Sequence, residues 1–138
     1  QVSSNYPEAL VIGGDQILAC GADWLDKPKN LTGAREQLLL LRGREHQLLT
    51  AVSVARAGAV IWRFCACSEL VMRNFSDDFL EKYLESEKGN VCKSVGGYRL
   101  EGPGIQLFSH IGGVYFDILG LPLISLLNFL RQQGAIQE

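Results

Sequence analysis

Residues 9–16 read Ala-Leu-Val-Ile-Gly-Gly-Asp-Gln, and this stretch decides the fold that the sequence predicts. Four consecutive apolar residues predict a buried β-strand, and the two glycines end it. Asp15 follows at once, so the predicted strand delivers a carboxylate to its exposed end. Such a carboxylate can bind a metal ion or accept a proton from water. The alternative is an aspartate that only satisfies the amides of a turn, and the residues alone leave both roles open.

A lysine beside a proline follows in Asp26-Lys27-Pro28. The proline keeps the backbone of Lys27 extended, and an ammonium group beside a stiff turn suits a contact with phosphate. The alternative is a solvated turn lysine. Together with Asp15, Lys27 indicates a site for phosphate chemistry.

The rest of the chain predicts an α/β class, because helical and strand-like patterns alternate along it. A length of 138 residues predicts a single domain over residues 1–138. Helices are predicted from Thr32 to Leu41, from Ser76 to Gly89 and from Pro122 to Gly134. Strands are predicted over residues 9–12, 48–55, 60–72, 105–108 and 115–119, with residues 16–20 continuing or pairing with the first and Gly58 as a hairpin turn.

The net charge of −2 argues against non-specific binding to nucleic acid, which needs a strongly basic surface. A small anionic ligand remains compatible with it. The longest uncharged apolar run, residues 118–130, contains Gly120 and Pro122. A membrane-spanning helix needs about 20 apolar residues, so we expect no membrane partner.

The four cysteines, Cys20, Cys65, Cys67 and Cys92, do not form a zinc signature, since C-x-C stands without a second pair. We expect all four to be buried small hydrophobic residues of a protein in the reducing cytoplasm.

Residues 42–46 read Arg-Gly-Arg-Glu-His, which places two guanidinium groups and an imidazole after a predicted helix. Arg44 could bind phosphate through bidentate hydrogen bonds. The alternative, a cation that complements the end of the helix dipole, is favoured for Arg42 over Arg44. His46 enters an apolar strand and is predicted to be structural.

Glu101 lies in the glycine-lined loop of residues 98–104, Tyr-Arg-Leu-Glu-Gly-Pro-Gly. Such a loop lets the backbone approach a flat ligand closely. An ionised carboxylate only accepts hydrogen bonds, so Glu101 suits a base edge that carries N–H groups. The alternative is an ion pair between Glu101 and Arg99.

These stretches, in this order, resemble the Maf family of nucleoside triphosphate pyrophosphatases. The resemblance covers nearly the whole chain. Each matching piece is weak alone, and the ordered set is specific: residues 12–16 (Ile-Gly-Gly-Asp-Gln), 27–28 (Lys-Pro), 34–36 (Ala-Arg-Glu), 43–50 (Gly-Arg-Glu-His through Thr), 97–98 (Gly-Tyr), 101–102 (Glu-Gly) and 120–123 (Gly-Leu-Pro-Leu).

The resemblance implies a Maf/ITPase-like mixed sheet flanked by helices, a homodimer, and hydrolysis of a nucleoside triphosphate to its monophosphate and diphosphate with Mg²⁺ or Mn²⁺. Asp15 falls on the family's catalytic acid and metal-binding position, and Lys27 on a lysine that contacts phosphates. Arg44 lies in a matching piece and Lys93 keeps the register of a family lysine, so both are expected to bind substrate.

Gln16 and Glu101 fall on two positions that the family ties to base choice. Pyrimidine-preferring members carry Thr and Gln there, whereas the branch associated with 7-methyl-GTP carries Gln and Glu. Guanine presents N–H donors to a carboxylate, and N7-methylation adds positive charge to the base. The resemblance therefore favours 7-methyl-GTP, with dTTP or UTP as the alternative.

Three departures from the family pattern support a second hypothesis. The chain begins at Gln1 and lacks the family's N-terminal Ser/Arg-rich phosphate loop, so we expect an N-terminally incomplete domain that is inactive if that loop is essential. Asp26 replaces a usual glycine and could pair with Lys27, and Cys92 replaces a usual aspartate. The second hypothesis is a non-catalytic nucleotide-binding regulator of cell division.

Overall fold

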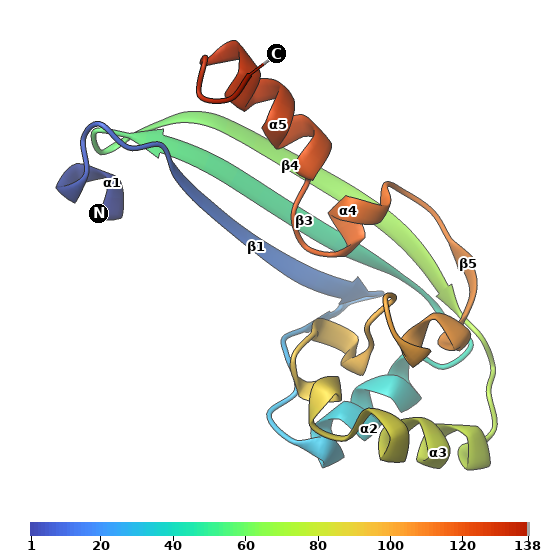
Figure 1. The fold of residues 1–138 in the computed structure, drawn as a ribbon. Coiled ribbons are helices and arrows are strands. Elements are labelled where there is room, and N and C mark those ends of the chain that lie inside the picture. Colours follow the sequence, from blue (N-terminus) through green and yellow to red (C-terminus); the bar gives the residue numbers. More distant parts are fainter. Residues whose placement is uncertain (138) are drawn as a thin grey trace. The chain divides into compact units, whose positions relative to one another are not determined.

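The computed structural model describes residues 1–137, and their elements form an α/β protein, as the sequence predicts (Figure 1). Within the described residues one five-stranded sheet has the strand order β2-β1-β3-β4-β5. Its strands are β1 (Val11–Cys20), β2 (Asp23–Leu25), β3 (Glu45–Arg56), β4 (Ala59–Met72) and β5 (Phe108–Ile111). The α-helices are α1 (Val2–Asn5), α2 (Leu31–Leu41), α3 (Asp77–Glu87), α4 (Tyr115–Ile118) and α5 (Leu123–Gln132), and the 3₁₀ helices are η1 (Lys88–Cys92), η2 (Val95–Gly97) and η3 (Pro103–Leu107).

The chain divides into two compact units, which are described separately below. The first unit comprises residues 1–16, 50–67 and those from 114 onward, and the second comprises residues 17–49 and 68–113. Strands β1, β3 and β4 each contribute residues to both units. The single domain expected from chain length stays a prediction.

The core of the first unit forms where α5 packs on one face of β3 and β4. Val52 and Val54 alternate along β3 and are buried with Leu126 and Phe129 of α5. The ring of Trp62 on β4 stacks on Phe129, with centroids 5.0 Å apart and planes 12° apart. Burial of such side chains contributes about 1.5–3 kcal/mol each relative to exposure. The β3–β4 hairpin turns at Ala57 and Gly58, both with positive φ (50° and 84°), which confirms the turn predicted at Gly58.

The second unit is held together by α2 and α3. Ala34, Leu38 and Leu41 are the buried face of α2, as the sequence spacing predicts. The hydroxyl of Ser76 accepts the Phe79 N–H at 3.2 Å and caps α3, which also confirms a prediction.

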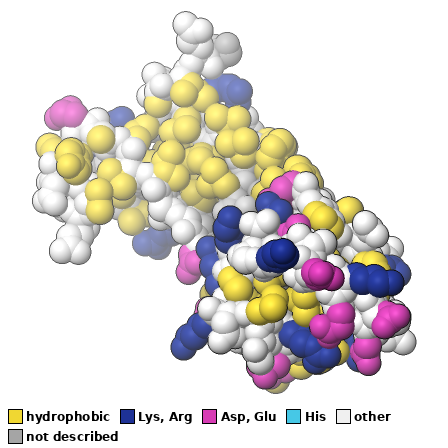
Figure 2. Space-filling model, turned by 60° about the horizontal axis from the view of Figure 1, so that its bottom comes forward, with side chains coloured by type: hydrophobic (Ala, Val, Ile, Leu, Met, Phe, Trp, Pro, Cys, Tyr) yellow, Lys and Arg dark blue, Asp and Glu magenta, His cyan; other side chains and the backbone are white. Residues whose placement is uncertain are grey.

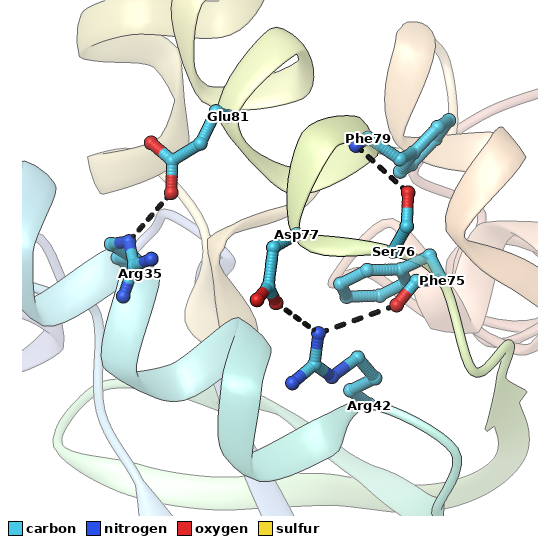
Figure 3. A network of polar contacts seen from close by, with 7 residues as sticks. All are labelled: Arg35, Arg42, Phe75, Ser76, Asp77, Phe79 and Glu81. Carbon is cyan, nitrogen blue, oxygen red and sulfur yellow. Dashed lines mark hydrogen bonds and ion pairs between the residues drawn. The ribbon is translucent and has the colours of Figure 1, made fainter.

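Two ion pairs connect the helices of this unit. Arg35 binds Glu81 at 2.8 Å, and Arg42 of the α2 C-cap binds Asp77 at 2.6 Å and the Phe75 carbonyl (Figure 3). Exposed pairs of this kind contribute little, typically about 0–1 kcal/mol. Figure 2 shows acidic and basic side chains intermixed over this unit, whereas hydrophobic side chains are exposed on the first unit.

Several predicted boundaries are wrong. Residues 11–20 form one continuous strand whose first half is largely exposed, so residues 9–12 are not a buried strand that ends at the glycines. The cap of α2 is Asn30, whose side chain accepts the Gly33 N–H at 2.9 Å, and not Thr32. Residues 103–107 form η3, not a strand.

Residues 115–118 form the short helix α4, where the sequence predicts a strand. A four-residue apolar run cannot be assigned to strand or helix from its periodicity. The helix forms because its carbonyl groups find partners on the sheet, as described below. The remaining strand predictions, 48–55 and 60–72, fall inside β3 and β4.

Candidate functional site

Asp15 lines an open groove of about 420 Å³ in the first unit. The groove is lined by Gly13, Gly14, Asp15, Ala51, Val52, Ser53, Arg63 and Cys65. Small residues create this hollow, and a Cβ atom at Gly14 would lie only 3.2 Å from the Ala51 carbonyl oxygen. Ala51 and Ser53 alternate with the buried Val52 and Val54, so the groove opens on the sheet face opposite the contact with α5.

Asp15 therefore lies within β1 and not beyond the end of a strand, which corrects the predicted position. Its side chain is exposed, and Oδ1 accepts the Gln16 N–H at 2.8 Å. This contact with a strand amide differs from the turn contacts of the alternative interpretation. The second carboxylate oxygen stays accessible from the groove for a ligand.

Gln16 faces the other side of β1, where its side chain holds α4. Its Nε2 atom donates to Thr50 Oγ1 at 2.8 Å and lies 3.2 Å and 3.0 Å from the carbonyl oxygens of Asp117 and Ile118. Thr50 Oγ1 donates in turn to the Asp117 carbonyl at 2.9 Å. The amide donors of Gln16 are thus engaged within the first unit, and its role in base choice stays a prediction.

Sequence reasoning missed two residues of this unit. Arg63 shares the groove with Asp15 and brings a cation to it, and Thr50 completes the contact with α4. The exposed alternation of Arg63 and Cys65 along β4 is the signal that would have indicated Arg63. Burial raises the pKa of the Asp117 carboxyl above its ordinary value.

Lys27 is exposed and lines a groove of about 810 Å³ in the second unit, where the chain enters α2. Gln37 Nε2 donates to the Asp26 carbonyl at 2.8 Å, which fixes the backbone beside Lys27 to the helix. The neighbouring Pro28 is buried. Among the described residues of this unit, no ion pair joins Asp26 to Lys27.

Arg44 and Lys93 are also exposed residues of the second unit. Arg44 donates to the Leu40 carbonyl at 3.3 Å and so complements the C-terminal turn of α2, whereas Arg42 is occupied by Asp77. This is the reverse of the expected preference, because the chain turns at Gly43 and directs Arg44 back to the helix. Lys93 follows η1.

His46 is buried in the second unit with only 2% of its surface exposed. Its Nε2 atom and the Tyr98 hydroxyl are 2.9 Å apart, and the rings of Tyr98 and Phe108 contact the imidazole. Among the described residues, Nδ1 has no hydrogen-bond partner. Burial lowers the pKa of His46 to about 4, with the Arg44 backbone opposing the shift. This environment suits the structural role expected from sequence.

Glu101 is exposed at a turn of the second unit. Among the described residues, the carboxylate that pairs with Arg99 is Glu87, at 3.1 Å, and not Glu101. The alternative role predicted for Glu101 therefore belongs to Glu87. The structure places Asp15 and Gln16 together in the first unit, and Lys27, Arg44, Lys93 and Glu101 in the second.

The expectation that all four cysteines are buried is wrong. Cys20 is buried, Cys92 is half-buried, and Cys65 and Cys67 are exposed, all as free thiols. The two exposed thiols alternate along β4 on its uncovered side. No cluster of three or more His, Cys, Asp or Glu side chains occurs among residues 1–137. In the same part of the chain, no helix has the length and apolar character needed to cross a membrane.

The model of the family of Maf-like proteins matches residues 1–133, and the chain belongs to this family. A protein of Granulibacter bethesdensis named nucleoside triphosphate pyrophosphatase is 51% identical over 136 residues, which cover 99% of this chain and 69% of that protein. One of Paramagnetospirillum magneticum with the same name is 48% identical over 99% of this chain and 70% of its own length. A protein of Rhizobium etli named 7-methyl-GTP pyrophosphatase is 44% identical over 98% of this chain and 68% of its own length.

Proposed function

We propose that this protein is a nucleoside triphosphate pyrophosphatase, a hydrolase acting on an acid anhydride. It converts a nucleoside triphosphate to the monophosphate and diphosphate. The observation that carries this proposal is the match to the Maf family over residues 1–133, together with relatives that bear this name. The exposed Asp15 in the groove of the first unit supports it chemically.

Asp15 is proposed as the catalytic acid that accepts the proton of the attacking water. Its free oxygen reaches the groove while Oδ1 is steadied by the Gln16 N–H. Lys27, Arg44 and Lys93 are proposed to contact the phosphates, since all three cations are exposed. Stabilising the charge that develops on phosphate oxygens is the largest contribution such residues make.

A divalent cation, Mg²⁺ or Mn²⁺, fits the same carboxylate. Mg²⁺ typically binds one or two protein carboxylates, keeps several waters and takes its other ligands from substrate phosphates. The accessible oxygen of Asp15 meets this requirement without a cluster of acidic side chains. When bound, the cation would neutralise phosphate charge and polarise the attacked phosphorus.

The substrate we propose is 7-methyl-GTP, with Glu101 and Gln16 as the residues that choose the base. Glu101 is exposed and free of Arg99, as acceptance of guanine N–H groups requires. The name of the Rhizobium etli relative agrees with this choice. The alternative is a dTTP or UTP pyrophosphatase. We further propose a cytoplasmic homodimer that does not act on nucleic-acid polymers.

The test is diphosphate release with Mg²⁺ from UTP, dTTP, CTP, GTP and 7-methyl-GTP. We expect selective release from 7-methyl-GTP. Asp15→Asn should lower kcat by roughly 10²–10⁴-fold, because general base catalysis is lost. Asp23→Asn, which changes another exposed aspartate of the sheet, is the matched control and should leave kcat unchanged.

Near-normal turnover in Asp15→Asn would refute its catalytic role. Binding of a nucleotide without diphosphate release, in a protein of the full length of its relatives, would instead support the non-catalytic regulator of cell division.

A further inference from the structure

Glu101 lies at the tip of a tight turn that is built around Arg99. The Gly102 N–H donates to the Arg99 carbonyl at 3.4 Å, which places Leu100 and Glu101 in the middle of the turn. Leu100 is buried and anchors the turn from inside. The chain then folds back so closely that a Cβ atom at Gly104 would lie 2.4 Å from the Arg99 carbonyl oxygen. The position of Arg99 thus fixes the position of Glu101.

The guanidinium group of Arg99 is held by Glu87, the last residue of α3. Arg99 Nε and Nη2 lie 3.2 Å and 3.1 Å from Glu87 Oε2, and Nη2 lies 3.4 Å from Oε1. The Glu87 side chain is only 5% exposed, whereas that of Arg99 is 29% exposed. Charge-assisted, two-oxygen contacts of this kind are the strong ones.

The same guanidinium group lies against the turn that carries Glu101. Arg99 Nη2 is 3.2 Å from the point where a Cβ atom of Gly102 would stand, beside Glu101 in the chain. A cation so close would compete with a base for the carboxylate of Glu101 if its donors were free. The contacts with Glu87 engage Nε and Nη2, so Glu101 faces solvent without this partner.

We propose that Glu87 is a specificity-determining positioning residue: by holding Arg99, it keeps the Glu101 carboxylate free to accept N–H groups of a guanine-type base. This inference rests on the proposed function and deepens it. Glu87 acts through Arg99 and does not touch the base. Two further contacts, Tyr83 hydroxyl to Gly97 carbonyl at 3.0 Å and Gly96 N–H to Gln37 Oε1 at 3.1 Å, steady the loop independently of this pair.

The test compares Glu87→Gln with the double variant Glu87→Gln/Arg99→Gln. Glutamine keeps the shape of Glu87 and removes its charge, so Arg99 is released toward Glu101. We expect the kcat/KM ratio for 7-methyl-GTP over UTP to fall about tenfold through KM, with kcat nearly unchanged, since a charged hydrogen bond to the base is lost. The double variant has no cation to release and should recover the ratio to within about threefold.

A role in anchoring alone gives a different pattern, because both variants lose the ion pair. Equal loss in the single and the double variant would therefore overturn the proposal. Glu85→Gln, on the exposed side of the same helix, is the control and should change nothing. Circular dichroism confirms that each variant is folded.

A second readout does not need turnover. In a crystal structure of Glu87→Gln, we expect the Arg99 guanidinium within hydrogen-bonding distance of the Glu101 carboxylate, and an unmoved Arg99 would refute the inference. Calorimetric binding of 7-methyl-GTP should weaken in the single variant and recover in the double one. Failure of the proposed function looks different, since the unchanged protein would then release diphosphate from no nucleotide.

Discussion

His46 shows how burial decides the chemistry of a single side chain. It resembles a catalytic histidine in sequence because it follows two arginines, yet it is enclosed by Tyr98 and Phe108. A buried imidazole without a partner for Nδ1 is stable only in its neutral form. Its contribution therefore lies in the stability of the second unit.

This environment predicts a loss of stability in acid. The pKa of His46 is about 4 in the folded protein, below the ordinary 6.5. Protons thus bind the unfolded chain more tightly, so the stabilisation is complete above pH 6.5 and is lost as the pH falls toward 4. We expect the free energy of unfolding to drop by about 3 kcal/mol over this range.

The control is His46→Gln, which retains a hydrogen-bonding group for Tyr98 and does not titrate. The difference in unfolding free energy between the two proteins, measured in urea at pH 7 and pH 4, should change by the same amount. A constant difference would show that His46 does not carry the pH dependence.

At the scale of elements, the β3–β4 hairpin contains a local strain that a substitution can relieve. Ala57 adopts φ of 50°, which is unfavourable for a residue with a Cβ atom, whereas asparagine tolerates it. Asn-Gly is the preferred pair for a two-residue turn of this type. Ala57→Asn should therefore stabilise the protein by about 0.5–1 kcal/mol, measured as a higher midpoint in urea.

The opposite change at the next residue should destabilise it. Gly58 has φ of 84°, and a Cβ atom there would lie 2.8 Å from Ser4 Oγ. We expect Gly58→Ala to cost about 1–2 kcal/mol. Equal stability of both variants would contradict the assigned turn.

Local sequence signals predicted the elements whose causes are local. The cap at Ser76, the buried face of α2 and the turn at Gly58 all follow from residues within a few positions. The helix α4 could not be predicted, because Gln16 and Thr50 bind its carbonyl groups from distant parts of the sequence. The exposure of Cys65 and Cys67 was missed for a related reason, since periodicity does not reveal which face of a sheet is covered.

The candidate site shows the same limit. Asp15 and Glu101 were identified as exposed carboxylates, but the partner of Arg99 was assigned to Glu101, which is two residues away, in place of Glu87, which is twelve residues away. Arg63 was overlooked because no motif surrounds it. Contacts between elements decided these cases, and one sequence carries no record of them.

At the scale of the whole molecule, a ligand that binds only the folded chain must stabilise it. A ligand at 100 times its Kd adds about 2.7 kcal/mol. We expect 7-methyl-GTP with Mg²⁺ to raise the melting temperature of Asp15→Asn, a variant that does not consume the ligand.

UTP at the same concentration serves as the control and should produce a smaller shift. A larger shift with UTP would favour the pyrimidine alternative. No shift with any nucleotide would argue against a nucleotide site in this chain.

The alternation of Asp15 and Gln16 on the two sides of β1 has a consequence for which insertions and deletions the family can accept. Loss of one residue between Val11 and Asp15 would exchange the two side chains, so that the acid would face α4 and the amide would face the groove. Substitutions in this strand can drift, but its length cannot. Length variation among homologues should therefore collect in exposed connections such as that around Gly89, and be absent from residues 11–16.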